Sequence, residues 1–242
     1  MKSRYYLLII ILISFLISLN TFKIFSIDET SIFLTVIGLI YGLIAAFSIS
    51  NAWEKFSKIR DAVAVETNSL ESLYIYSKYL SDRSSFRKIK LKILDYCKEV
   101  PNIEWNQYWL SEKTHTKFRE LVNLVAAIKI NNEKDKEIFD EVSEELREAA
   151  AARNSQLVLS QTKIPKMQWI LNIFLSVILV IGLIFLSIPN YYLSIFIVAS
   201  MIASVLLILF VIYDLDSLRT AEEEVSIAPY NKLVKFISKD KI

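Results

Sequence analysis

Four stretches of the chain contain no Lys, Arg, Asp, Glu or His. They cover residues 5–19, 31–53, 169–188 and 191–213. A helix of about 17 to 25 apolar residues crosses a hydrocarbon layer of about 30 Å. The last three stretches have this length, and the first reaches it when it is extended through Phe22. The pattern predicts an all-α integral membrane protein with four transmembrane helices.

The first stretch also has the form of the start of a secretory signal peptide, because Lys2 and Arg4 precede it. No small-x-small cleavage pattern follows in residues 18–22, so we interpret it as a retained helix.

Basic residues also follow the second stretch and lead into the third, whereas the two short loops carry only Lys23. The positive-inside rule therefore places both termini and residues 54–168 in the cytoplasm of a multi-pass protein of the cell membrane.

Residues 54–168 contain no glycine and only two prolines, Pro101 and Pro165, so they are expected to be almost entirely helical. Apolar residues recur at spacings of three, four and seven from Phe56 to Leu80, without a break after the second stretch. This periodicity predicts one long helix over residues 31–80.

Three further helices are predicted over residues 86–100, over residues 114–130, and from Asn132 towards Pro165, with a short amphipathic piece around Trp105 and Trp109. The expected organisation has four parts. They are transmembrane helices 1 and 2 (residues 1–53), a cytosolic helical bundle (54–168), transmembrane helices 3 and 4 (169–213) and a cytosolic C-terminal tail (214–242).

Charge and composition remove several classes of function. Residues 54–168 hold 20 basic and 18 acidic residues, so no single-sign field indicates nucleic-acid binding. His115 and Cys97 are the only residues of their types, which argues against a zinc site, Cys/His catalysis and an internal disulfide. No glycine-rich phosphate loop or nucleophile elbow is present. We therefore expect neither an enzyme nor a bound cofactor.

Acidic residues follow the last stretch. Asp214 and Asp216, together with Glu222 and Glu223, are weak candidates for a divalent-cation site, since such cations take clustered oxygen ligands. A solvated helix is the commoner explanation of such a run.

The second stretch carries two patterns of interest. Gly38 and Gly42 form a small-xxx-small pair that lets another helix approach closely, either within one subunit or between subunits. On an adjoining face, Leu39, Leu43 and Phe47 repeat every four residues. Such a row faces lipid or a protein core, or forms a dewetting constriction in a pore.

No stretch contains an ionisable side chain, which disfavours an ion-coupled transporter. A channel needs none at its narrowest part, but it needs several helices around an axis. Four helices per chain therefore imply a homo-oligomer.

The segment from Phe47 through Trp53-Glu54-Lys55-Phe56 to Arg60 resembles the start of the bestrophin domain, and more closely the prokaryotic bestrophin-like membrane family. Further pieces look similar in order and spacing, over roughly residues 31–229. They are Glu66-Thr67-Asn68-Ser69-Leu70, Tyr96 followed by Glu104-Trp105, Ala152-Arg153 with Leu157, Pro165 with Trp169, and Asp214-Leu215-Asp216.

This resemblance implies four membrane helices, cytoplasmic termini, a helical cytosolic bundle and a pentameric channel. It also matches Leu39, Leu43 and Phe47 to the hydrophobic neck of bestrophins.

The chain departs from the family pattern in two places. The paired asparagines that typically follow the neck Phe are replaced by Ser48-Ile49-Ser50, with Asn51 displaced. The Pro-Phe-x-Gly turn usual after the last membrane helix is replaced by Ser217-Leu218-Arg219-Thr220, which predicts that helix continues there.

The leading hypothesis is a pentameric, bestrophin-like channel that passes small inorganic ions across the lipid bilayer through a pore lined by the second helix. Leu39, Leu43 and Phe47 would form its gate. Thr35, Ser48 and Asn51 would be its polar flanks. The alternative is a non-conducting membrane scaffold or sensor whose cytosolic helices bind a partner.

Overall fold

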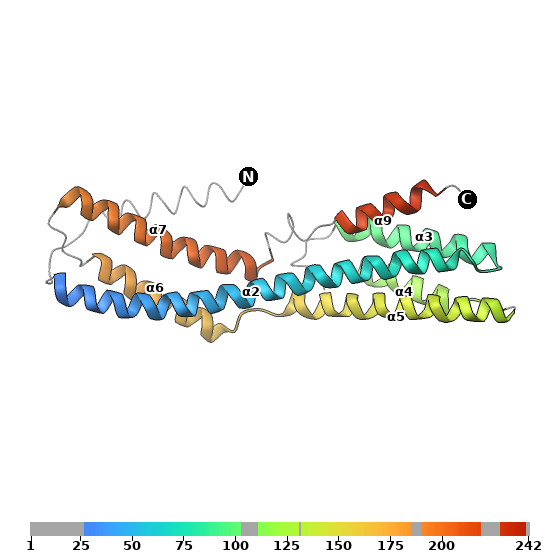
Figure 1. Cartoon of the computed structure of the whole chain (residues 1–242), viewed down its shortest axis with the longest axis horizontal. Coiled ribbons are helices and arrows are strands. Elements are labelled where there is room, and N and C mark those ends of the chain that lie inside the picture. Colours follow the sequence, from blue (N-terminus) through green and yellow to red (C-terminus); the bar gives the residue numbers. More distant parts are fainter. Residues whose placement is uncertain (1–26, 103–110, 131, 185–189, 219–227, 241–242) are drawn as a thin grey trace. The chain divides into compact units, whose positions relative to one another are not determined.

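The computed structural model describes residues 27–102, 111–130, 132–184, 190–218 and 228–240 (Figure 1). Every regular element within these ranges is a helix, which confirms the predicted all-α class for the described part of the chain.

The longest element is α2 (Ile27–Ser77), with 51 residues. It passes Trp53 without a break, as the periodicity of residues 31–80 predicts. From Leu43 to its end α2 contains neither Gly nor Pro, the residues that most often kink or stop a helix.

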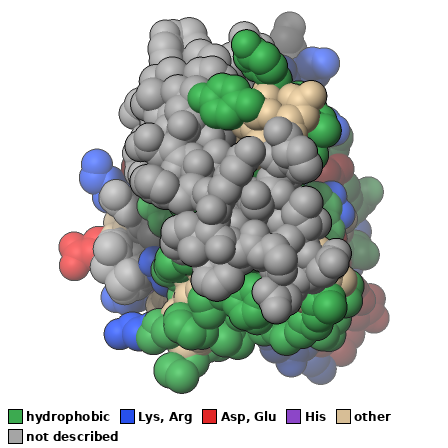
Figure 2. All heavy atoms as spheres, turned by 90° about the vertical axis from the view of Figure 1, so that its left-hand side faces the viewer, with side chains coloured by type: hydrophobic (Ala, Val, Ile, Leu, Met, Phe, Trp, Pro, Cys, Tyr) green, Lys and Arg blue, Asp and Glu red, His purple; other side chains and the backbone are tan. Residues whose placement is uncertain are grey.

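The described residues form two compact units, and α2 contributes to both. The first unit holds α2 up to Trp53, together with α6 (Lys166–Ile184) and α7 (Tyr191–Asp216). By length and composition these are three helices able to cross a membrane. Apolar side chains make up most of the coloured surface nearest the viewer at this end of the molecule (Figure 2). The predicted helix over residues 5–19 lies outside the described residues.

The core of the first unit is built from all three helices. Tyr41 and Ala45 of α2 pack with Leu179 of α6 and Val205 of α7, and the Tyr41 hydroxyl donates a hydrogen bond to the Val205 carbonyl oxygen at 3.3 Å. α6 lies close to α2 at Gly182, where an added Cβ would lie 2.6 Å from a methyl carbon of Leu34.

The second unit holds α2 from Glu54 onwards and four further helices, with a 3-10 turn at Val100–Asn102. These helices are α3 (Arg83–Glu99), α4 (Glu112–Ala126), α5 (Glu133–Gln161) and α9 (Ala228–Lys239). Its core includes Ile59 and Leu70 of α2, Ile93 of α3, Leu121 of α4 and Val142 of α5.

Side-chain caps set where these helices begin. Asp82, Ser111 and Asn132 each accept a hydrogen bond from a backbone N–H of the first turn that follows. The caps place the starts of α3 and α4 a few residues before the predicted positions, because apolar periodicity only begins inside the helix. α4 also ends at Ala126, earlier than the predicted residue 130.

Two features of the C-terminal part were not expected from the sequence. α9 is an additional helix that buries Tyr230, Leu233 and Ile237 at helical spacing. The predicted continuation of helix is wrong at residues 217 and 218, because α7 ends at Asp216 and Leu218 has a φ of 55°. Residues 219 and 220 lie outside the described residues. The Leu218 side chain is buried in the core of the second unit, and this burial offsets the cost of a left-handed backbone.

We expect Gly182→Ala to lower the unfolding free energy of the chain by about 1–3 kcal/mol, because the new methyl group overlaps the Leu34 side chain. Gly42→Ala is the matched control, since an added Cβ there meets nothing within 4 Å in the described chain. Thermal unfolding in a detergent that keeps chains apart measures both. Equal stability of the two variants would show that α2 and α6 do not approach closely at Gly182.

Candidate functional site

Leu39, Leu43 and Phe47 project from the surface of the first unit. Their side chains are 71, 61 and 60% exposed in the single chain. The opposite side of α2 carries buried Tyr41 and Ala45, so the row lies on the side of the helix that faces away from the core.

In the second unit, taken by itself, α2 also has an exposed side. It carries Glu54, Lys58, Asp61, Val65 and Asn68, which follow one another at spacings of three and four. We call these residues, together with Leu39, Leu43 and Phe47, the open face of α2. Its first part is apolar. Its second part is mostly polar, and there Lys58 Nζ lies 2.6 Å from Glu54 Oε1.

The three predicted polar flanks are placed differently from one another. Thr35 and Asn51 are exposed. Ser48 is fully buried, and its hydroxyl accepts hydrogen bonds from Gln168 Nε2 and Asn172 Nδ2 of α6, each at 2.8 Å. One residue after Phe47 is about 100° further around a helix, which turns Ser48 towards the core. Ser48 therefore joins α2 to α6, and it does not lie on the open face.

The two glycines of α2 also differ. An added Cβ at Gly38 would make an ordinary contact of 3.9 Å with Leu179 of α6, whereas at Gly42 it would meet nothing within 4 Å. Among the described residues nothing packs against Gly42, so contact between subunits stays one of its two interpretations, beside packing against a part of the chain outside the described residues.

The acidic candidates for a metal site are not brought together. Asp216 accepts hydrogen bonds from the Ile164 N–H at 2.8 Å and from Trp169 Nε1 at 3.3 Å, which fixes the start of α6 against the end of α7. Glu222 and Glu223 lie outside the described residues. No group of three or more His, Cys, Asp or Glu able to hold a metal occurs in the part of the chain that the structure describes.

A buried polar cluster lies in the second unit, and neither spacing nor charge pattern predicted that its residues would meet. Glu66 of α2 is fully buried, and its carboxylate accepts three hydrogen bonds. The donors come from three other helices: Tyr96 Oη at 2.5 Å, Gln156 Nε2 at 2.6 Å and Tyr230 Oη at 2.8 Å. We call Glu66, Tyr96, Arg153, Gln156 and Tyr230 the Glu66 cluster.

Arg153 of α5 supplies the positive charge of this cluster. Its guanidinium donates to Tyr96 Oη at 2.5 Å and to Thr114 Oγ1 of α4 at 3.3 Å, and it lies over the rings of Tyr96 and Phe118. A buried charge is tolerated only when it is paired and hydrogen-bonded. Here Tyr96 links the cation to the carboxylate.

Burial raises the pKa of Glu66, and hydrogen bonds from Tyr96, Gln156 and Tyr230 and the charge of Arg153 act against that rise. Burial also raises the pKa of the neighbouring Cys97 thiol well above its usual range.

The Glu66 cluster and its contact with Thr114 join five helices. Glu66, Tyr96, Thr114, Arg153 and Tyr230 each come from a different helix.

The pieces of sequence that resemble the bestrophin-like family meet in the structure. Glu66, Tyr96 and Arg153 join in one cluster, and Trp169 and Asp216 join in another contact. The profile of the Bestrophin-like domain matches residues 27–218. The chain belongs to the Bestrophin-like family.

Solved structures agree with this Bestrophin-like assignment at the level of the fold. A variant of a bacterial bestrophin homologue from Klebsiella pneumoniae has a TM-score of 0.72 and 13% identity, and the alignment covers 99% of this chain and 98% of that one. A second structure of the Klebsiella homologue has a TM-score of 0.71 at 12% identity, covering 96% of each chain. A structure described as a membrane protein has a TM-score of 0.70 at 12% identity, covering 97% of this chain and 96% of that one. No curated protein sequence matches this chain.

The Bestrophin-like match begins at the first described residue of α2 and ends at Leu218. It therefore includes the open face and every member of the Glu66 cluster except Tyr230, which the chain adds from α9.

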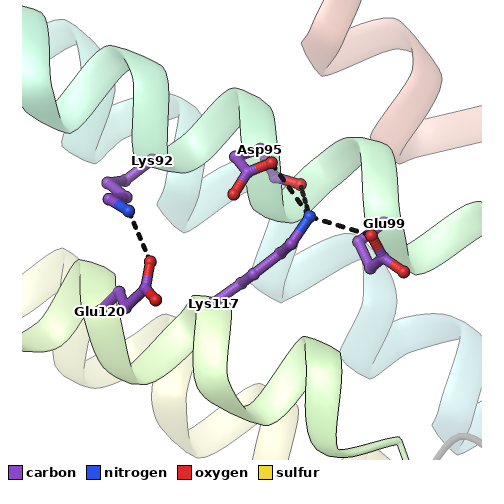
Figure 3. A network of polar contacts seen from close by, with 5 residues as sticks. All are labelled: Lys92, Asp95, Glu99, Lys117 and Glu120. Carbon is purple, nitrogen blue, oxygen red and sulfur yellow. Dashed lines mark hydrogen bonds and ion pairs between the residues drawn. The ribbon is translucent and has the colours of Figure 1, made fainter.

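We expect Arg153→Ala and Glu66→Ala each to lower the unfolding free energy by about 3–5 kcal/mol, because each leaves the other charge buried without its partner. The double variant should lose much less than the sum of the two. The matched control is the Lys92–Glu120 ion pair between α3 and α4, whose side chains are about two-fifths exposed (Figure 3). Its removal should change stability by about 1 kcal/mol at most. Additive losses at Glu66 and Arg153 in denaturant titration would contradict the coupling.

The raised pKa of Glu66 predicts a pH dependence with a definite sign. The folded protein holds this proton more tightly than the unfolded chain, so the stabilising contribution is complete below the unfolded pKa and is lost as the pH rises through the folded pKa. Glu66→Gln is the non-titrating reference. The stability of the wild type relative to this variant should be greater at about pH 4 than at about pH 8. The opposite trend would mean that Arg153 and the donors outweigh burial.

Proposed function

We propose that this Bestrophin-like chain forms a homopentameric ion channel in the cell membrane, with a pore lined by the open face of α2. The observation that carries the proposal is the length of this face. It is exposed on α2 both before and after Trp53, while the opposite side of the helix is buried in the core of each unit. Glu54, Lys58 and Asp61 are exposed in the second unit, and such a polar side of α2 suits the water-filled continuation of a pore.

A ring of chains around one axis explains both parts of the face. Leu39, Leu43 and Phe47 would form the narrow, apolar part of the pore. An ion that enters such a constriction loses its hydration without gaining oxygen ligands, so the row would act as a hydrophobic gate. Thr35 and Asn51 would be its polar flanks, and the polar part of the open face beyond Trp53 would line a wider, wet passage.

The remaining topology follows from the same proposal. Four membrane helices per chain would place both termini and residues 54–168 in the cytoplasm, consistent with the basic residues that flank the apolar stretches. Residues 1–53 and 169–213 would form the membrane part, and residues 214–242 a cytosolic tail. Gly42, where an added Cβ meets nothing within 4 Å among the described residues, would face an adjacent subunit.

We expect the triple substitution of Leu39, Leu43 and Phe47 by Ala to raise ion flux through the protein in reconstituted liposomes. Smaller side chains both widen the constriction and weaken the expulsion of water. An ion-flux assay with a trapped indicator measures the effect.

The matched control replaces three exposed apolar residues of α6, Ile170, Phe174 and Ile181, by Ala. These changes remove similar apolar surface from the first unit but leave the open face unchanged, so flux should stay at the wild-type level. Equal flux changes in both variants would assign the row to lipid contact. No flux from any form, or a monomer in native mass measurement, would favour the scaffold over the channel.

A further inference from the structure

Basic residues gather on one surface of the second unit. α3 carries six Lys and Arg and two acidic residues, and α9 carries three Lys and no acidic residue. The acidic residues of α3, Asp95 and Glu99, both bind Lys117 of α4 (Figure 3). Five of the exposed cations on these two helices form what we call the basic surface: Arg87, Lys88, Lys232, Lys235 and Lys239.

Acidic residues gather on α5. This helix carries eight Asp and Glu against four Lys and Arg, one of which is the buried Arg153. Five exposed acidic residues form what we call the acidic ridge: Glu137, Asp140, Glu141, Glu144 and Glu148.

Like charges four residues apart recur within the ridge, an arrangement that destabilises a helix. Arg147 pairs with Glu144, but the ridge keeps an excess of negative charge. The neighbouring Glu145 has a raised pKa, because of its burial first and the charge of Glu148 second.

An apolar groove of about 310 Å³ runs beside the ridge, between α4 and α5. Its lining includes Val122 and Val125 of α4 and Phe139, Leu146 and Ala150 of α5. On the other surface, Leu91 of α3 stands among the cations with 65% of its side chain exposed. Each of the two surfaces therefore combines one sign of charge with an apolar element.

The two surfaces lie on opposite sides of α2 within this unit. In Figure 1 α9 lies along one side of α2, and α5 lies along the other. Copies of the unit arranged around an axis in front of the open face would bring the basic surface of one copy next to the acidic ridge of the next.

We propose that the basic surface of α3 and α9 docks onto the acidic ridge and apolar groove of α5 in a neighbouring copy of this chain. The contact is heterologous, so each copy uses both of its surfaces once and the ring closes without a free charged face. The inference rests on the proposed ring assembly. It locates a contact between neighbouring copies in the second unit, outside the apolar helices. A second copy is the occupant that supplies both the opposite charge and the matching apolar element.

Cross-linking tests the contact directly. The full-length variant with Lys235→Cys and Asp140→Cys, treated with a bismaleimide in detergent, should give a ladder of covalent oligomers on a denaturing gel. Cys97 is fully buried, so the native thiol does not compete. Each single substitution should give no cross-linked dimer, and Lys235→Cys combined with Lys113→Cys should give no ladder, because Lys113 lies on the side of α4 turned away from the groove. A cross-linked dimer from either single variant would mean a two-fold contact and overturn the proposal.

Charge reversal provides a second measurement. Changing Lys232, Lys235 and Lys239 to Glu should lower the cross-linking yield between Arg87→Cys and Glu148→Cys about tenfold, because like charges then meet across the contact. Adding Glu137→Lys, Asp140→Lys and Glu141→Lys should restore the yield. An unchanged yield after the first reversal would overturn the docking.

Native mass measurement of the wild type separates the two proposals. An oligomer that gives no ladder would remove this contact but leave the channel in place. A monomer would remove both.

Discussion

A carboxylate that is closed off from water has to find its hydrogen-bond donors inside the protein, and Glu66 imposes this requirement on the whole second unit. Its donors, and the cation that balances it, come from α3, α5 and α9, and Thr114 of α4 completes the shell of Arg153. Hydrophobic packing alone tolerates sliding of one helix along another. The Glu66 cluster has one arrangement in which its donors and acceptors meet, so it fixes the register of five helices at once.

The first unit is held together differently. Within the apolar stretches its helices meet through close packing at Gly182 and through a small set of neutral hydrogen bonds centred on Ser48 and Asn172. Neutral donors and acceptors suit an apolar environment, because they require no buried charge. The carboxylate of Asp216 lies just beyond the last apolar stretch, and the second unit buries a carboxylate and a guanidinium that Tyr96 bridges.

The elements were largely predictable because apolar periodicity and the scarcity of Gly and Pro are local signals. They gave the uninterrupted α2, and they placed α3, α4 and α5 within a few residues. The departures arise where a distant contact decides. Leu218 takes a left-handed backbone and its side chain is buried in the core of the second unit. Ser48 lies on the inner side of α2 by helical phase, but its partners Gln168 and Asn172 come from the distant α6. The Glu66 cluster could not be read from spacing, since its members lie up to 164 residues apart. The separation of basic residues on α3 and α9 from acidic residues on α5 could not be predicted either. The near-equal totals of acidic and basic residues do not show which surface of the folded unit each of them occupies.

The unbroken course of α2 has a geometric consequence. From Leu43 to Ser77 no Gly or Pro interrupts the ladder in which each backbone N–H is bonded to a carbonyl four residues earlier. The angle between two side chains around the axis of this stretch is therefore set by the number of residues between them, at about 100° per residue. One inserted or deleted residue would turn every side chain on one side of the change by about 100° relative to those on the other, and this would bring exposed side chains into the core and buried ones into solvent.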